Sequence, residues 1–367
     1  MMITREELDE IKNRDFLDKR NHFSQHNDVK SEKILGNFYE ESPLVTIVMP
    51  IYNHPAPYFE RALKSAIEQK GFSDYQILIV DNDAEGKNGN EEIVHKLSSS
   101  KVVYFRNEKN IGLFGNWSRA CLLAQSKWIT YLHSDDMLKE NFLATMCPII
   151  LQHSEIDQLA SSSVNFDSDE FDESVLTGLK GTENRKHLLV KKVSVSEYYD
   201  GMATSVKGAL MKRDCLLDIG GFRDFGQGLG LSDYTAMLKY AYYYNTYHVG
   251  FLSYLNGWGK NDSLNLSLWY PEMVANYHMQ MFFNKKGNYL IRYLNKCKYT
   301  SILYRQAQQY NSGRNFSGKI IPVDMEQMER DCEIKRTPNL LYYKLIRKCV
   351  NGAKNLWLQI GQEKFYI

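Results

Sequence analysis

The sequence has few cysteines, and none of them has a spacing that indicates a metal site. Six cysteines are scattered over 367 residues, and no C-x-x-C pair occurs. This pattern argues against a disulfide framework and against a structural zinc site. It fits a protein of the reducing cytosol.

Long hydrophobic runs are also missing. No apolar stretch approaches the roughly 20 residues that a helix needs to span a bilayer, so we expect no transmembrane helix. The N-terminal stretch MMITREELDEIKNRD is charged and lacks the apolar core of a secretory signal peptide. We therefore expect a cytoplasmic protein.

Net charge is nearly absent as well. The 45 Lys and Arg residues balance 44 Asp and Glu residues, which leaves a formal net charge of +1. Any attraction to phosphates or membranes must then come from local patches, and we expect no nucleic-acid partner. Aromatic residues are abundant at 13%, with 25 tyrosines. A half-buried tyrosine can offer its hydroxyl to a sugar or a headgroup.

Strand-like and helix-like segments alternate from Leu44 onward. The segments LVTIVMPIYN, YQILIVDND, KVVYFRN and KWITYLHSDD are apolar and predict buried strands, with amphipathic helices between them. Four alternations in about 90 residues predict a parallel sheet with helices on both faces, and ligands bind beyond the carboxyl ends of such strands. The polar residues expected to meet there are Asn53, Asp81, Asn82, Asp83, Arg106, Asn107, Asp135 and Asp136.

Five segments together carry a family resemblance. VTIVMPIYN, QILIVDNDA, RNEKNIGLFGNWSRA, YLHSDDML and GGFRDFGQGLGLSDYTAMLKYA have the order and spacing of the family 2 glycosyltransferases. The chain resembles the inverting, bacterial cell-surface polysaccharide type over roughly residues 44–260. The resemblance implies an α/β protein with the GT-A fold, which is a Rossmann-like, mostly parallel central sheet flanked by helices, with a helical C-terminal extension here.

The resemblance also divides the chain. Residues 1–42 are expected to form a charged, partly helical extension. Residues 43–270 are expected to form the glycosyltransferase domain, with a nucleotide-sugar half at 43–150 and an acceptor half at 151–270. Residues 271–367 are expected to be helical.

The stretch His133-Ser134-Asp135 stands where the family has its D-x-D signature. The resemblance implies that Asp135 binds Mn²⁺ or Mg²⁺ together with the diphosphate of the donor, and such hard cations prefer oxygen ligands. His133 departs from the signature, so we expect weaker metal affinity and a neutral imidazole that donates to a ribose hydroxyl or a phosphate. The alternative is that Asp135 and Asp136 only form a turn or a helix cap.

The donor pocket follows from the same resemblance. Tyr52 and Asn53 are expected beside the nucleobase and ribose, and Asp81 is expected to accept from uracil N3–H, which favours UDP or dTDP over ADP. Asp81 could instead be a strand-end turn residue, and Asn116 could be a plain helix cap rather than a ribose or diphosphate ligand. The full donor set is Pro50, Tyr52, Asn53, Asp81, Asn82, Arg106, Asn110, Gly112, Asn116, His133 and Ser134.

Asp233 matches the family's catalytic base, and Ser232 replaces the glutamate that often precedes it. If Ser232 caps a helix, Asp233 lies in the first turn, where the helix dipole favours its ionised form. The alternative is an ordinary acidic first-turn residue. The expected acceptor-side residues are Gly221 and Phe222 in a tight turn, Ser232, Trp258, and Lys260, which could contact the diphosphate.

The C-terminal stretch NLLYYKLIRKCVNGAKNLWLQIGQEKFYI predicts a basic amphipathic helix. Such a helix can lie on an anionic membrane surface, which would make the protein peripheral on the inner face of the cytoplasmic membrane. The alternative is packing on the catalytic domain or on a second subunit in a homodimer. Tyr293, Tyr299 and Tyr304 are expected to be packing residues.

The expected function is transfer of a hexose or N-acetylhexosamine from a UDP-sugar to a saccharide acceptor. A polyprenyl-diphosphate-linked acceptor in O-antigen, capsule or other surface polysaccharide synthesis is the leading hypothesis. A sugar nucleotidyltransferase would need a Gly-rich phosphate loop after the first strand, and MPIYNHPAPYF lacks one. A non-catalytic nucleotide-sugar-binding or scaffold protein is the other hypothesis. His133 and Ser232, which replace acids of the family motifs, favour it. The presence of Asp135 and Asp233 argues against it.

Overall fold

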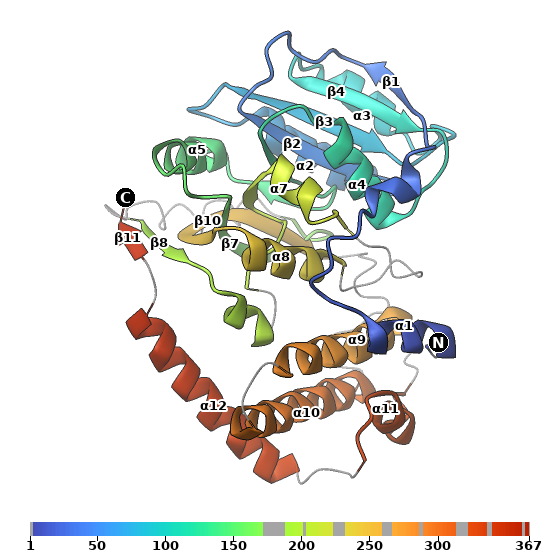
Figure 1. Ribbon diagram of the computed structural model, residues 1–367. Helices are drawn as coiled ribbons and strands as arrows, with labels where there is room; N and C mark the ends of the chain where they lie inside the picture. The colour runs from blue at the N-terminus through green and yellow to red at the C-terminus, as the bar shows by residue number, and fades with distance from the viewer. Residues whose placement is uncertain are drawn as a thin grey trace. The chain divides into compact units, whose positions relative to one another are not determined.

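The computed structural model describes most of the chain: residues 3–171, 188–200, 203–222, 232–258, 266–285, 289–312, 322–335, 340–361 and 364–366. The chain divides into two compact units (Figure 1). The sheet unit comprises Lys19–Asp224, Ser232–Gly259 and Glu363–Ile367. The helical unit comprises Met1–Asp18, Phe225–Leu231 and Lys260–Gln362.

The four predicted strands form the centre of the sheet. They are β2 (Val45–Ile51), β3 (Tyr75–Asp81), β4 (Val102–Asn107) and β5 (Trp128–Tyr131). They run parallel in the spatial order β4-β3-β2-β5. Every residue of β2 and β3 is buried, because helices cover both faces of a parallel sheet and leave no polar face. The predicted α/β class is confirmed.

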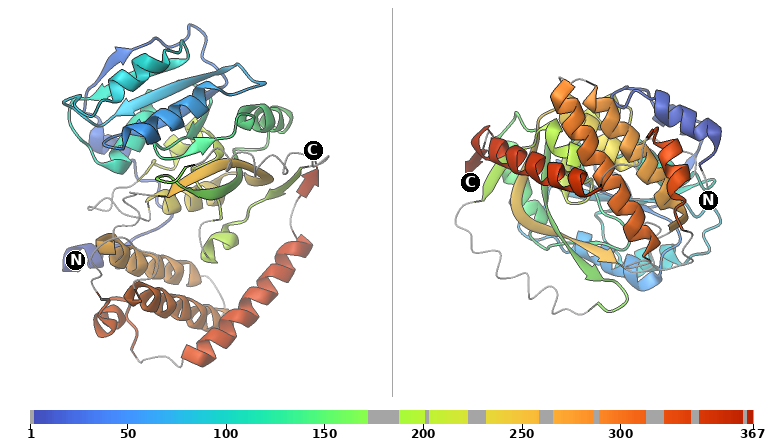
Figure 2. Two further views of the ribbon diagram at one scale, coloured as in Figure 1. Left: turned by 180° about the vertical axis from the view of Figure 1, so that it is seen from behind. Right: turned by 90° about the horizontal axis from the view of Figure 1, so that it is seen from below.

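The helices between these strands lie on the two faces of the sheet. Figure 2 shows α2 (Ala56–Ile67) and α3 (Asn90–Leu97) on one face and α4 (Leu113–Leu123) on the other. In α2 the buried residues recur at helical spacing and include Phe59, Ala62, Leu63 and Ala66. This is the stripe that faces the core.

The second half of the sheet is mixed. Beyond β5 the order continues β9-β7-β10-β8-β11, and β6 (Met137–Leu138) pairs with β10. Strand β7 (Gln158–Asp167) is parallel to β10 (Thr246–Trp258). Strand β9 (Ala209–Lys212) pairs antiparallel with both β5 and β7. Strand β8 (Leu189–Lys192) pairs antiparallel with β10 and with β11 (Lys364–Tyr366). Helices α5 (Phe142–Gln152), α7 (Arg213–Asp218) and α8 (Ser232–Tyr243) and the short helix η3 (Val195–Asp200) complete this part.

The N-terminal region differs from its prediction. Residues 1–42 contain α1 (Arg5–Asn13), the short helix η1 (Phe23–His26) and an unexpected strand, β1 (Ser31–Leu35). Strand β1 pairs antiparallel with β4 at the sheet edge. Its sequence SEKIL is short and has no buried residue, so it lacks the apolar alternation that reveals a half-buried strand.

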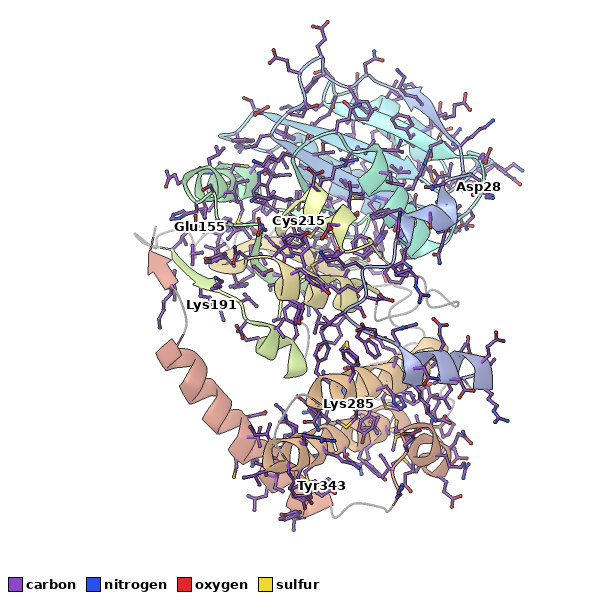
Figure 3. All side chains as sticks on the ribbon, viewed as in Figure 1. Asp28, Glu155, Lys191, Cys215, Lys285 and Tyr343 are labelled. Atoms are coloured by element: carbon purple, nitrogen blue, oxygen red, sulfur yellow. The ribbon has the colours of Figure 1, made fainter. Side chains whose placement is uncertain are left out.

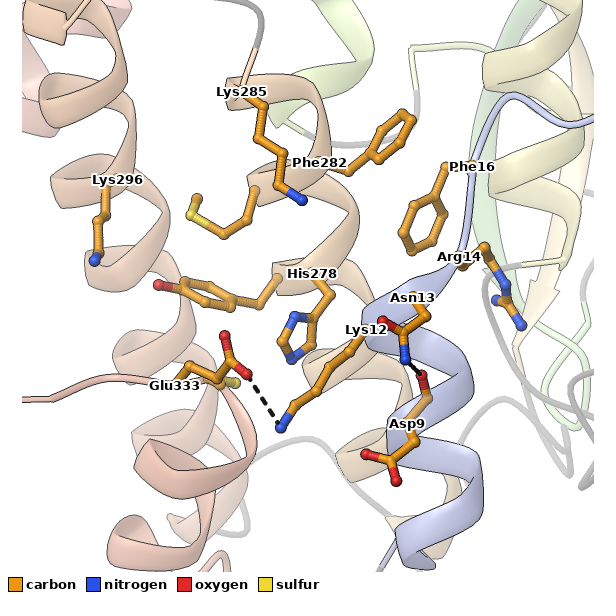
Figure 4. Close-up of a pocket in the computed structure, with 13 residues that line it drawn as sticks. Asp9, Lys12, Asn13, Arg14, Phe16, His278, Phe282, Lys285, Lys296 and Glu333 are labelled. Atoms are coloured by element: carbon orange, nitrogen blue, oxygen red, sulfur yellow. Dashed lines mark hydrogen bonds and ion pairs between the residues drawn. The ribbon is translucent and has the colours of Figure 1, made fainter.

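The helical unit contains α1, α9 (Leu266–Asn284), α10 (Tyr289–Asn311), α11 (Met325–Asp331) and α12 (Leu340–Gly361). A cavity of about 510 Å³ in this unit is lined by Phe16, Tyr277 and Phe282, among others, and by the ion pair of Lys12 and Glu333 at 3.5 Å (Figure 4). None of the residues predicted for sugar transfer lines it. Within the described residues, no helix has both the length and the apolar character required to cross a membrane.

Candidate active site

The loop after β5 gathers a histidine and two carboxylates. Asp135 and Asp136 are buried, with 7% and 0% of their surfaces exposed. The potential ligand atoms of His133, Asp135 and Asp136 all lie within 4.8 Å of one another. The loop leaves the carboxyl end of a central strand, which is where a ligand site is expected in such a sheet.

Asp136 is held by its neighbours. Its Oδ2 accepts a hydrogen bond from the Tyr254 hydroxyl at 2.7 Å, and its Oδ1 accepts from the backbone N–H of Gly257 at 2.7 Å. The ammonium of Lys207 lies 3.0 Å from Oδ2. A buried carboxylate is tolerated when it is paired and hydrogen-bonded in this way. Asp136 therefore anchors the loop to β10.

Lys207 is a site residue that the sequence analysis missed. Its Nζ also donates to Oδ1 of Asn256 at 2.6 Å. Burial lowers the pKa of the Lys207 ammonium, but attraction to Asp136, Asp135 and Asp233 outweighs burial and raises the pKa overall. One lysine thus interacts with the two loop carboxylates and with the predicted base. It belongs to no recognisable motif, so the sequence carried no signal for it.

His133 is neutral in this environment. Burial lowers its pKa well below the ordinary value, and the charge of Lys207 and His54 lowers it further. Its ring lies against Trp117, with 4.5 Å between the ring centroids. Its Nε2 is buried and has no hydrogen-bond partner in the part of the chain that the structure describes. A buried, uncharged ring nitrogen of this kind suits a metal ligand or a hydrogen bond to a bound molecule.

A divalent cation therefore fits this loop through two residues. The Asp135 carboxylate and the His133 imidazole are of the types that Mn²⁺ and Mg²⁺ sites use, with carboxylate preferred. Both oxygens of Asp136 already accept hydrogen bonds, which leaves Asp136 a poor third ligand. Arg61 of α2 also interacts electrostatically with Asp135, which adds positive charge beside it.

Asp233 lies in the first turn of α8. Its Oδ1 accepts a hydrogen bond from the Tyr234 backbone N–H at 2.7 Å. Burial raises the pKa of the Asp233 carboxyl. The hydrogen bond from Tyr234 and the charge of Lys207 lower that pKa, but the effect of burial is larger, so the pKa is raised overall. This differs from the expectation that the helix dipole favours the ionised form, because burial acts in the opposite direction and is stronger. A raised pKa makes the carboxylate a stronger base.

Three buried asparagines, Asn82, Asn107 and Asn116, form a network at the strand ends that also includes the exposed Asn110. Asn107 donates to Oδ1 of Asn82 at 3.1 Å and to Oδ1 of Asn116 at 2.9 Å, and Asn82 donates to Asn110 at 2.7 Å. Asn116 donates to backbone carbonyls of Ile51 and of β3. Both amide hydrogens of Asn116 are thus used inside the protein. The network ties the strand ends to α4, and the contact of Asn116 with ribose or diphosphate stays a prediction.

Asp81 and Arg106 are also engaged by protein groups. The Asp81 carboxylate is fully buried and accepts from the Tyr104 hydroxyl at 2.6 Å and from Asn90 at 3.2 Å. Burial raises the pKa of Asp81. Arg106 forms an ion pair with Glu91 at 2.7 Å. Base recognition by Asp81 and nucleotide contact by Arg106 stay predictions, and the structure gives both side chains a role in holding the strand ends.

The other donor-side residues are distributed between surface and core. Tyr52 is 47% exposed directly after β2, and Asn53 beside it is exposed. Pro50 is buried within β2, and Ser134 is buried in the loop. Gly112 has a φ of 76° before α4, a conformation that glycine adopts without strain. Tyr52 and Asn53, together with the exposed Asn110, are accessible to a nucleotide from solvent.

The predicted tight turn at Gly220-Gly221-Phe222 is confirmed. Gly220 and Gly221 have φ of 90° and 75°, and a Cβ on Gly221 would lie 2.4 Å from the Phe23 ring. The Phe222 ring is buried and meets Trp117 edge-on, with 5.2 Å between centroids. It supports the wall behind His133, which differs from the predicted contact of Phe222 with an acceptor. The side chains of Ser232 and Trp258, and all of Lys260, lie outside the described residues.

Comparison with known proteins shows what the chain is similar to. The family model "Glycosyl transferase family 2" matches residues 46–214. An uncharacterized glycosyltransferase of Methanocaldococcus jannaschii, MJ1057, is 28% identical over 123 residues, which are 33% of this chain and 42% of that protein. The putative colanic acid biosynthesis glycosyl transferase WcaA of Escherichia coli is 28% identical over 116 residues, 32% of this chain and 39% of that protein. The chain thus matches about two fifths of the length of these curated relatives.

Solved structures show the same fold. The S. aureus TarS 1–349 structure in complex with UDP has a TM-score of 0.51 and 15% identity, over 83% of this chain and 87% of that chain. The complex of TarS 1–349 with UDP-GlcNAc has a TM-score of 0.52 and 14% identity, over 83% and 88%. Residues 46–214 thus resemble glycosyl transferase family 2, and the chain has the GT-A fold of these solved structures.

Proposed function

We propose that this chain is an inverting glycosyltransferase that moves a hexose or N-acetylhexosamine from a UDP-sugar to a saccharide acceptor. The observation that carries the proposal is electrostatic. The charge of Lys207 interacts with Asp135 in the loop after β5 and with Asp233 at the start of α8. Two acidic residues that are distant in sequence thus both influence the pKa of one ammonium group, which supports a shared site.

Asp233 is proposed as the base. Its carboxylate takes the proton of the acceptor hydroxyl while that oxygen attacks the anomeric carbon. The bond from the anomeric carbon to the diphosphate oxygen breaks, and its electron pair leaves with UDP. Attack from the face opposite the leaving group inverts the anomeric configuration. Burial, which raises the pKa of Asp233, strengthens the base.

Asp135 and His133 are proposed to hold Mn²⁺ or Mg²⁺ together with the donor diphosphate. When bound, the cation supplies positive charge to the departing diphosphate. Lys207 supplies a second, permanent positive charge beside the same loop. With only these two protein ligands proposed, we expect the metal to bind mainly with the donor.

The proposed donor is a uridine diphosphate sugar. Tyr52 stands exposed at the end of β2, where its ring can stack on a base. Support comes from the TarS complexes with UDP and with UDP-GlcNAc. A polyprenyl-diphosphate-linked acceptor in O-antigen, capsule or related surface polysaccharide synthesis is proposed by analogy with WcaA, a putative colanic acid biosynthesis enzyme.

A donor screen tests the proposal. The full chain is incubated with several nucleotide sugars and candidate saccharide acceptors, and the free nucleoside diphosphate is measured. We expect UDP release from one UDP-sugar, and we expect Asp233→Asn to abolish it while UDP binding measured by calorimetry persists. Full turnover by Asp233→Asn would eliminate Asp233 as the base.

A non-catalytic nucleotide-sugar-binding protein is the second candidate. Its specific support is the engagement of Asp136, whose two oxygens are both occupied by protein donors, together with His133 in place of an acid. In that case UDP binds to the chain, and no nucleotide sugar in the screen is turned over with any acceptor.

A further inference from the structure

Large apolar side chains are exposed at the beginnings of α10 and α12. On α10, Tyr289 is 86% exposed and Leu290 63%. On α12, Leu341 is 80% exposed and Leu345 61%. Three further side chains on these helices are 41–47% exposed. Together we call these residues the α10–α12 patch: Tyr289, Leu290, Ile291, Tyr293, Leu341, Tyr342 and Leu345.

The two groups belong to one surface. Helices α10 and α12 pack against each other within the helical unit, and Figure 3 shows Tyr343 where α12 begins beside α10. The Tyr293 and Tyr342 side chains hydrogen-bond across the pair. Tyr293, which was expected to be a packing residue, contacts α12 in this way but is 41% exposed, whereas Tyr299 and Tyr304 are buried as expected. A contiguous exposed patch of this kind marks an interaction surface.

Within α10 and α12, the charge beside the patch has a single sign. The sequence of α10 contains no acidic residue, and neither does that of α12. Exposed Arg292 and Lys296 flank the patch on α10, and exposed Lys344 and Lys348 flank it on α12. The chain as a whole is nearly neutral, so this basic character is local to the two helices.

We propose that the α10–α12 patch docks on the surface of an anionic bilayer. Leucine and isoleucine side chains would enter the boundary between headgroups and acyl chains, where tyrosine rings are also favoured. The lysines and arginine would contact anionic headgroups. A second copy of the chain suits the patch less well, because a two-fold interface places identical surfaces together and would oppose cation to cation. The proposal is independent of the sugar-transfer chemistry.

Vesicle sedimentation tests the proposal with the full chain. We compare vesicles of phosphatidylcholine alone with vesicles that also contain phosphatidylglycerol. Wild type should partition onto the anionic vesicles and be released by salt. Leu290→Ser, Leu341→Ser and Leu345→Ser combined should lower the partition coefficient at least about tenfold. Leu151→Ser is the matched control, because Leu151 is 62% exposed on α5.

Two outcomes would overturn the proposal. One is wild type that stays in the supernatant with anionic vesicles, or a triple variant that partitions like wild type. The other comes from sedimentation velocity without lipid. A wild-type dimer that the triple variant loses, with no effect on vesicle binding, would assign the patch to self-association. Lys344→Gln with Lys348→Gln should weaken vesicle binding at low salt and should leave any such dimer intact.

Discussion

The ammonium nitrogen of Lys207 lies 3.0 Å from Oδ2 of Asp136. Asp136 is fully buried and Lys207 is about three-quarters buried, with 25% of its side chain exposed. The pair joins the loop after β5 to the segment before β9. Because the charge of Lys207 also interacts with Asp135 and Asp233, this contact organises the proposed active site around one permanent cation.

Lys207→Met should destabilise the sheet unit by about 3 kcal/mol, because removing one partner of a buried pair leaves the other charge uncompensated. Urea unfolding measures the change. The double variant Lys207→Met with Asp136→Asn is the control and should recover part of the loss, since it removes both charges. A single variant as stable as wild type would show that the pair contributes nothing to stability.

Asp233 should set the acid limb of the pH–rate profile. Its folded pKa is raised by burial, so the base is ionised above that pKa and becomes protonated as pH falls through it. We expect kcat/KM to decline on the acid side at a pH above 3.8, the ordinary pKa of an aspartate carboxyl. An acid limb absent down to that value would remove Asp233 from the role.

The same shift predicts a stability effect. A raised folded pKa means that the folded state binds the proton more tightly, so the contribution to stability is present at low pH and is lost as pH rises through the folded pKa. At neutral pH the ionised, partly buried Asp233 is therefore unfavourable. Asp233→Asn should be at least as stable as wild type near neutrality, while turnover falls at least about 100-fold. Thermal unfolding at several pH values provides the measurement.

Asp135→Ala should remove the metal-dependent part of UDP binding. In calorimetry with Mn²⁺ present, the affinity of this variant for UDP should be lower than that of wild type by about tenfold or more. When UDP is titrated in the presence of a chelator, the variant and wild type should differ little. His133→Gln should give a smaller loss, because it removes a neutral ligand and leaves the carboxylate. Equal Mn²⁺ dependence in wild type and Asp135→Ala would place the metal elsewhere.

Asn116→Ala distinguishes the network described here from the predicted nucleotide contact. Its amide donates to two buried backbone carbonyls, and orphaned buried groups cost about 1–3 kcal/mol each. We expect a stability loss of about 2 kcal/mol or more by urea unfolding. Asn53→Ala, on an exposed residue, serves as the control. Unchanged stability with weakened UDP binding would favour the nucleotide contact.

Parts of this architecture were predictable because the residues carry strong local patterns. Strands β2 and β3 are continuous apolar runs, and α2 has a clear buried stripe. Strand β1 was not predictable, since SEKIL is short and its partner β4 comes from more than 60 residues further along the chain. Its pairing depends on the sheet edge and leaves no periodic signal.

The candidate site was predictable only in part. Aligned motifs identified Asp135 and Asp233, but they could not reveal Lys207, which reaches Asp136 only through the tertiary fold. Asn116 was likewise identified by its position, whereas its partners are backbone carbonyls of two other strands. Burial, which raises the pKa of Asp233, is also a tertiary property. A sequence shows which residue types stand at the strand ends. It does not show whether their polar groups already have hydrogen-bond partners within the folded protein.

A crystal structure of the chain with UDP and Mn²⁺ tests the central claim most directly. We expect the diphosphate beside Asp135, with Lys207 within hydrogen-bond distance of a phosphate oxygen or of Asp136. We also expect the Asp233 carboxylate to face the β-phosphate across the space for the sugar. UDP bound away from the β5 loop, for example in the cavity of the helical unit, would contradict it. So would a β-phosphate that Asp233 does not face.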